Sequence, residues 1–233
     1  MEAMIDFARG PLFVGAFSFM VLGYIRHVAL TLMEVKRALN RAGDKTLPGK
    51  LIWRATLKWL NPLGDLKNRL MMRIFSVLFH ISILIVPLFL AGHIVLWTRG
   101  TGLHWPAIPN EAADLLTIVA MVTAVILVVQ RTLSRATRAL SRFQDYALPL
   151  IVALPFASGF LLMHPFVNPF SFESTLLVHI MSANLVFVLM PTTKLSHAVL
   201  LPSVQLVSEV GWHWPKESGS RVGIDLNKEG EPV

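Results

Sequence analysis

The stretch LMMRIFSVLFHISILIVPLFLAGHIVLW, residues 70–97, decides the fold of this chain. Its single charged residue is Arg73, and it exceeds the roughly 20 apolar residues that a helix needs to cross a membrane. It also contains His80 and His93, and an unpartnered polar side chain in hydrocarbon costs several kcal/mol. The stretch therefore predicts a membrane-spanning helix with two functional side chains.

The composition of the whole chain is that of an integral membrane protein. Of its 233 residues, 54% are hydrophobic and 15% are charged, and the mean hydropathy is +0.60. A soluble domain has about 25% charged residues. The net charge of +7 does not indicate nucleic-acid binding, because the basic residues lie between apolar segments. The absence of cysteine excludes disulfides, thiolate-bound iron–sulfur clusters and covalent c-type haem.

We predict an all-α integral membrane bundle of five helices. The predicted spans are residues 11–33, 70–98, 113–133, 146–164 and 175–201. Together they form one domain, residues 1–201. A polar tail, residues 202–233, follows and contains several prolines and glycines, so it is expected to be extended and to order only on a partner. The first ten residues lack the basic region of a cleaved signal peptide, so the first span is expected to remain in the mature protein.

The distribution of lysine and arginine predicts the orientation. Residues 34–70 contain nine basic residues and residues 131–142 contain four, whereas residues 99–112 contain one and residues 165–174 contain none. Basic loops are retained in the cytoplasm, so the N-terminus is predicted to be periplasmic and the C-terminus cytoplasmic. Within the first basic loop, the short amphipathic run Leu51–Leu60 is expected to lie along the inner membrane interface.

Four histidines fall at matching depths in the second and fifth spans. Since these spans run in opposite directions, His93 is expected to pair with His179 near the outer side, and His80 with His197 near the inner side. At about 100° per residue, eighteen residues return His197 to the face of His179. Thirteen residues leave His93 about 140° from His80 on an ideal helix, unless the intervening Pro87 changes the winding.

Two depth-matched pairs of neutral imidazoles predict two non-covalent b-type haems, each with histidine at both axial positions. The alternative is a haem-free membrane anchor or a proton-relaying transporter, in which the histidines bond between helices. His27 lies beside Arg26 at the inner end of the first span, as an interface residue or as a ligand in place of His80.

Two runs of sequence resemble a known family. The run Phe79-His80 through Pro87-Leu88 to His93-Ile94-Val95-Leu96-Trp97 resembles the second span of the respiratory nitrate reductase gamma-subunit family of dihaem cytochromes b. The run from His179-Ile180-Met181-Ser182-Ala183-Asn184-Leu185 to Met190-Pro191-Thr192-Thr193-Lys194-Leu195-Ser196-His197 resembles its fifth span. The similarity covers residues 11–201 and is greatest to the short branch in redox complexes of sulfate-reducing bacteria, of the high-molecular-weight cytochrome c type. The thirteen-residue interval in the second span is longer than in nitrate reductase gamma subunits proper.

The resemblance implies an electron-transfer subunit of an oxidoreductase complex in the bacterial inner membrane. Its iron ligands would be His80, His93, His179 and His197. Electrons would pass between a quinone pool or a periplasmic cytochrome and a cytoplasmic iron–sulfur subunit, alongside other membrane and periplasmic cytochrome subunits. Quinol/quinone oxidoreductase activity is one form of this function, with menaquinone as the candidate quinone.

Two further sets of side chains are candidates for contacts with these groups. Cations near the membrane boundary are expected to pair with anionic haem propionates, with simple anchoring of the spans as the alternative. The propionate candidates are Arg26, Arg73 and Lys194 on the inner side and Arg99 on the outer side. A quinone pocket needs polar groups that can exchange protons, and its candidates are Asn184, His104, His164 and Arg99.

Overall fold

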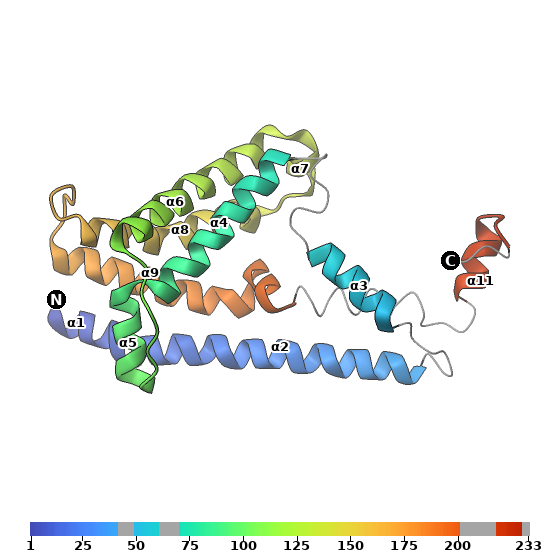
Figure 1. Ribbon diagram of the computed structural model, residues 1–233, viewed down its shortest axis with the longest axis horizontal. Helices are drawn as coiled ribbons and strands as arrows, with labels where there is room; N and C mark the ends of the chain where they lie inside the picture. Colours follow the sequence, from blue (N-terminus) through green and yellow to red (C-terminus); the bar gives the residue numbers. More distant parts are fainter. Residues whose placement is uncertain (42–48, 61–69, 201–217, 230–233) are drawn as a thin grey trace. The chain divides into compact units, whose positions relative to one another are not determined.

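The computed structural model describes residues 1–41, 49–60, 70–200 and 218–229, and all regular secondary structure in these ranges is helical (Figure 1). The long helices are α2 (Phe13–Arg41), α4 (Leu70–Phe89), α6 (Asn110–Leu133), α8 (Phe143–Met163) and α9 (Phe172–Thr192). The shorter elements are α1 (Glu2–Phe7), the π-helix η1 (Ala8–Leu12), α3 (Gly49–Leu60), α5 (Ala91–Thr101), α7 (Arg135–Leu140), the 3₁₀-helix η2 (Lys194–Ser196) and α11 (Ser218–Asp225).

The predicted fold class is confirmed: the protein is an all-α, multi-pass membrane protein. In the described part of the chain, five helical segments are long and apolar enough to cross a membrane: Glu2–Arg37, Leu70–Phe89, Asn110–Leu133, Phe143–Met163 and Phe172–Thr192. Their order agrees with the five predicted spans. The orientation of the termini stays a prediction.

The chain divides into two compact units. Unit 1 contains residues 1–19 and 65–189, and unit 2 contains residues 20–64 and 190–233. In the predicted tail, residues 201–217 and 230–233 lie outside the described residues, as do residues 42–48 and 61–69 of the first basic loop. The described part of the tail is not extended as expected, because residues 218–225 form α11.

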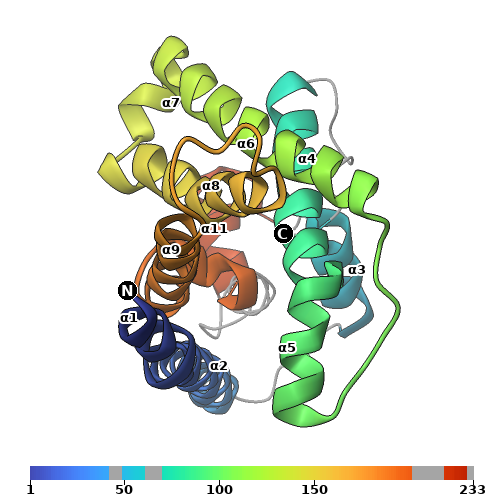
Figure 2. The same ribbon diagram turned by 90° about the vertical axis from the view of Figure 1, so that its left-hand side faces the viewer.

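Unit 1 is a helical bundle in which α6 packs against both α4 and α8 (Figure 1). Close approach is possible because one face of α6 consists of small buried residues at helical spacing, Ala113, Thr117, Ala120 and Ala124. Helix α9 lies beside α8 and beside the N-terminal helix, as Figure 2 shows. The core of the bundle therefore uses small residues, as membrane helices do where lipid and protein are equally apolar.

The second predicted span is two helices where one was expected. Helix α4 ends at Phe89, Leu90 is extended (φ −71°, ψ 130°), and α5 begins at Ala91. The break lies three residues after Pro87, which has no N–H for the helical ladder. Because His80 is on α4 and His93 on α5, the thirteen-residue interval does not determine their relative angle.

Each carbonyl of the last turn of α4 finds a donor beyond the break. Val86 O accepts from Leu90 N, and Phe89 O accepts from Ile108 N. The other two are met by side chains: Pro87 O by His93 Nδ1 and Leu88 O by Trp105 Nε1. Helix ends leave such carbonyls without intrahelical partners, and lipid offers no water to replace them. The end of α4 is therefore stabilised by residues that follow it in the chain.

The fifth predicted span is also interrupted. Helix α9 ends at Thr192, Thr193 is extended (φ −127°, ψ −171°), and η2 precedes His197. The expectation of one helix over residues 175–201 is therefore wrong. The eighteen-residue interval no longer implies that His179 and His197 share one helix face, because that inference needs an uninterrupted helix.

The cysteine-free sequence allows a direct test of the predicted orientation. Ala107, between α5 and α6, and Ala136, on α7, are both exposed and lie beyond opposite ends of α6. We expect Ala107→Cys to react with a membrane-impermeant maleimide in intact spheroplasts, and Ala136→Cys to react only after permeabilisation. The wild-type chain is the control, since it has no thiol. The reverse pattern would contradict the orientation.

Candidate functional site

The structure brings His93 of α5 and His179 of α9 together inside unit 1. Their ring centroids are 6.1 Å apart, and the two ring planes are inclined by only 12°. Both side chains are half-buried, although imidazole is polar. The two residues come from helices far apart in the sequence, so their proximity is a property of the fold.

Both rings donate a hydrogen bond from Nδ1 to a backbone carbonyl. His93 Nδ1 donates to Pro87 O over 3.1 Å, and His179 Nδ1 donates to Pro155 O over 2.8 Å. A carbonyl oxygen only accepts, so Nδ1 has the proton and the neutral ring keeps its lone pair on Nε2. This arrangement is typical of metal-ligating histidines, whose other ring nitrogen is held by a carbonyl or carboxylate.

The spacing of the two rings fits a metal ion bound between them. A metal lies about 2 Å from an imidazole nitrogen, so two rings that bind one ion from opposite sides have their centres roughly 6 Å apart. The observed 6.1 Å agrees, and near-parallel rings are compatible with such a shared axis. Two neutral nitrogens are also the donor set that a b-type haem requires. The residues present therefore fit the haem expected at this pair.

Helix α8 supports His179 through a glycine. A Cβ at Gly159 would lie 3.1 Å from His179 Cε1 and 3.3 Å from Nδ1, so the ring packs directly on the α8 backbone. Ser158 Oγ lies 3.3 Å from the same Nδ1 and also bonds within its own helix. The close approach lets the ring reach Pro155 O, and a side chain at residue 159 would displace it.

Helix α5 is held in place by an aromatic cluster, Phe13, Phe17, Trp97 and Phe187. Phe17 makes edge-to-face contacts with Trp97 at 5.7 Å and with Phe187 at 5.7 Å. Trp97 lies four residues after His93 and therefore on the same face of α5. Packing of Trp97 against the N-terminal helix thus directs His93 toward α9.

His80 and His197, the predicted inner pair, also donate from Nδ1 to carbonyls. His80 bonds Ser76 O over 2.6 Å and His197 bonds Lys194 O over 2.7 Å. Both side chains are exposed. His80 belongs to unit 1 and His197 to unit 2, and their pairing stays a prediction. Over the described ranges, no cluster of three or more His, Asp or Glu side chains with metal-ligand spacing is found.

His27 uses the opposite ring nitrogen. Its Nε2 lies 2.7 Å from Pro191 O and donates to this carbonyl in the last turn of α9. Gly23, one turn earlier on α2, allows this approach, because a Cβ there would lie 2.5 Å from Pro191 Cβ. The role of His27 in unit 2 is therefore the cap of a helix end, which agrees with the interface interpretation.

Asn184, a predicted quinone-pocket residue, is committed to the bundle. It is 3% exposed, and its Nδ2 donates over 3.0 Å to Ala8 O. Ala8 begins η1, where Pro11 interrupts the α-helical ladder. Asn184 therefore joins α9 to an irregular turn of the N-terminal helix, while its Oδ1 has no hydrogen-bond partner among the described residues.

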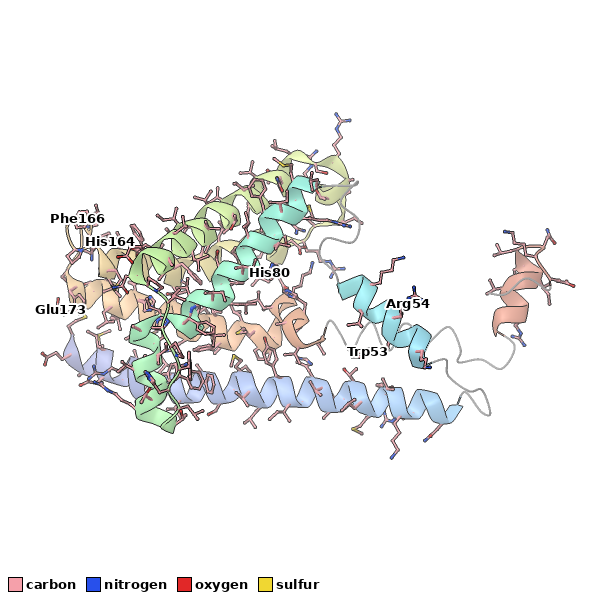
Figure 3. All side chains as sticks on the ribbon, viewed as in Figure 1. Trp53, Arg54, His80, His164, Phe166 and Glu173 are labelled. Carbon is pink, nitrogen blue, oxygen red and sulfur yellow. The ribbon has the colours of Figure 1, made fainter. Side chains whose placement is uncertain are left out.

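The other quinone-pocket candidates bond to different neighbours. His164 donates from Nδ1 to Phe160 O over 2.9 Å, and its Nε2 lies 3.3 Å from Asp114 Oδ2. Figure 3 shows His164 beside Phe166 at one end of unit 1, well away from His80. His104 is exposed, with Nδ1 3.4 Å from Thr98 Oγ1. None of the printed interactions of the described chain joins two of Asn184, His104, His164 and Arg99.

The four propionate candidates are spread over both units. Arg99 is exposed and lies on α5 six residues after His93, about 9 Å along the helix axis. Arg73 is half-buried near the start of α4. Arg26 and Lys194 are exposed residues of unit 2. Of the four, Arg99 is the one that shares a helix with His93.

The supporting residues at His93 and His179 were not identified from the sequence. They are the carbonyls of Pro87 and Pro155, and the small residues Ser158 and Gly159. Any residue has a carbonyl, so sequence offers no signal for the first two. A glycine within a helical, apolar pattern is the one available signal, since it often marks a close approach.

Removal of the Asn184 amide tests how the N-terminal helix is held. We expect Asn184→Ala to lower the free energy of unfolding in detergent by about 1–3 kcal/mol, because Ala8 O loses its buried donor. The matched control is Ser182→Ala on the same helix. Ser182 is also buried, but its hydroxyl bonds only His179 O in the previous turn. Equal shifts of the thermal midpoint in the two variants would contradict a tertiary role for Asn184.

The comparisons with known proteins place the chain in a family. A protein of Nitratidesulfovibrio vulgaris strain Hildenborough, named only "Protein", is 34% identical over 207 residues, which cover 84% of this chain and 88% of that protein. No protein-family model matches the chain. No solved structure matches it either. The chain belongs to the same family as this Nitratidesulfovibrio vulgaris protein.

Proposed function

We propose that the chain is the membrane cytochrome b subunit of a redox complex and that it relays electrons across the bilayer through two b-type haems. The observation that supports this most strongly is the pair His93 and His179. Two half-buried imidazoles with centres 6.1 Å apart, each held through Nδ1 by a proline carbonyl, leave two Nε2 atoms for one iron. A pair of histidines that merely bonded between helices would not need this common tautomer.

Each residue of the pair has a defined task in this proposal. His93 and His179 would fill both axial positions, which leaves no open position for dioxygen or substrate. Pro87 O and Pro155 O would fix the ring orientation and increase the basicity of Nε2. A bound haem would supply the one-electron chemistry, and the apolar helices around it would exclude water from the iron. The site is thus suited to electron transfer rather than to bond-making.

The second haem is proposed at His80 and His197. Both residues have the same Nδ1 donor arrangement as the outer pair. His27 is less suited to replace His80, because its Nε2 proton is donated to Pro191 O. Arg99 is the proposed partner of a propionate at the outer haem, and Arg26, Arg73 and Lys194 are those on the inner side.

The setting follows from the resemblance and from the charge distribution. We propose the bacterial inner membrane, with the outer haem toward the periplasm and the basic loops toward a cytoplasmic iron–sulfur subunit. A cysteine-free chain cannot itself hold an iron–sulfur cluster through thiolates. It therefore requires other subunits, periplasmic cytochromes among them, to supply or accept electrons. The relative comes from a sulfate reducer, which agrees with the branch that the sequence resembles. A quinone site, with menaquinone as candidate, is a secondary part of the proposal.

Single alanine substitutions distinguish the two haems. In the full-length protein, His93→Ala and His179→Ala are each expected to remove the same haem and to halve the haem-to-protein ratio. His80→Ala and His197→Ala should remove the other one. The measurement is haem content with the reduced-minus-oxidised spectrum of each purified variant.

The control for these variants is His104→Ala, which changes an exposed histidine outside both pairs. It should retain full haem content. If His93→Ala or His179→Ala keeps both haems, the outer pair is not a ligand pair. If the wild-type chain binds none, the haem-free anchor or transporter becomes the better description.

A change beside His179 tests the geometry without removing a ligand. Gly159→Ala places a Cβ 3.1 Å from His179 Cε1, so the ring must shift away from Pro155 O. We expect a lower haem-to-protein ratio, with loss of the same spectral component as in His179→Ala. Alanine favours a helix over glycine, so no loss of helix stability is expected.

The control for this change is Gly100→Ala, because Gly100 is also helical but has no atom within 4 Å of an added Cβ. It should leave haem content unchanged. Full haem content and an unaltered spectrum in Gly159→Ala would argue against the proposed support of His179.

A further inference from the structure

Helix α3 has a row of cations on one side. Its sequence, GKLIWRATLKWL, contains Lys50, Arg54 and Lys58 at every fourth position and no acidic residue. Residues four apart on a helix are displaced by about 40°, so the three cations span roughly 80° of the helix surface. All three are exposed. They therefore form one positive stripe with no internal counter-charge in the helix.

The other side of α3 is apolar in sequence, and the described side chains there are exposed. Trp53 is 66% exposed and Leu57 is 51% exposed. Figure 3 shows Trp53 and Arg54 projecting from different sides of the helix. A surface tryptophan next to cations is typical of a helix that lies at a membrane–water interface. With 12 residues and a length of about 18 Å, α3 is too short to span the membrane.

The chain connections keep α3 close to the membrane surface. It lies between the first two candidate spans, α2 and α4, and is joined to them by residues 42–48 and 61–69. Even a fully extended chain reaches at most about 3.6 Å per residue. Segments of seven and nine residues therefore cannot take α3 far from the headgroup layer on the side where this loop emerges.

We propose that α3 is a binding site for anionic phospholipid headgroups, lying along the bilayer surface with Lys50, Arg54 and Lys58 on the phosphates. Trp53 and Leu57 enter the boundary between headgroups and acyl chains. The argument for lipid as the occupant is charge complementarity, since three aligned cations without an acid match a layer of negative phosphates. This site is independent of haem binding.

A spin label measures the depth of α3 directly, because the chain has no other thiol. Leu57→Cys in the full-length protein would be labelled with a nitroxide and placed in bilayers of phosphatidylcholine alone or mixed with phosphatidylglycerol. In the mixed bilayer we expect higher accessibility to oxygen than to a water-soluble nickel chelate. In pure phosphatidylcholine the preference should shift toward the nickel chelate.

Two charge variants in the Leu57→Cys background make the test specific. Lys50→Gln, Arg54→Gln and Lys58→Gln together should abolish the dependence on phosphatidylglycerol. The matched control replaces three other exposed cations, Arg135, Arg138 and Arg142, by glutamine and should retain it. Equal nickel accessibility in both bilayers would overturn the proposal. A label that neither reagent reaches would also overturn it, since a protein surface would then cover α3.

Discussion

The structure depends on one constraint: a backbone carbonyl at membrane depth must have a donor, and water is not there to supply it. At the end of α4 this constraint is met by residues beyond the helix, among them His93 at Pro87 O and Trp105 at Leu88 O. The break at Leu90 is stable because these donors are present. The same hydrogen bond that closes the helix end gives His93 its tautomer, so a structural requirement and a ligand geometry are satisfied by one contact.

Similar contacts recur where other helices are irregular. His179 bonds Pro155 O, His27 bonds Pro191 O, and Asn184 bonds Ala8 O next to the π-helical turn. The choice of ring nitrogen separates the histidines. Those that donate from Nδ1 keep Nε2 as the acceptor nitrogen, whereas His27 donates from Nε2. The distinction gives a physical reason to assign ligand roles to some membrane histidines and capping roles to others.

The fold class was predictable from hydropathy, because a spanning helix needs a long apolar segment and little else. The ends of α6 and α8 agree closely with residues 113–133 and 146–164 for that reason. The breaks at Leu90 and Thr193 were not predictable, since a break depends on donors that tertiary structure delivers. Angles counted along residues 80–93 and 179–197 assumed straight helices and therefore failed. Depth was the better guide, because it led to His93 and His179 as neighbours without any assumption about helix faces.

The candidate site was predictable in its residue types but not in its support. Histidine in an apolar span is costly and therefore conspicuous, whereas the proline carbonyls and Gly159 acquire their roles only when α8, α9 and α5 pack. Resonance Raman spectroscopy of the oxidised, full-length protein tests the central claim most directly, because the porphyrin modes report the coordination of iron. Two low-spin, six-coordinate b-type haems are the predicted result. A five-coordinate, high-spin haem in the intact protein would contradict ligation by paired imidazoles.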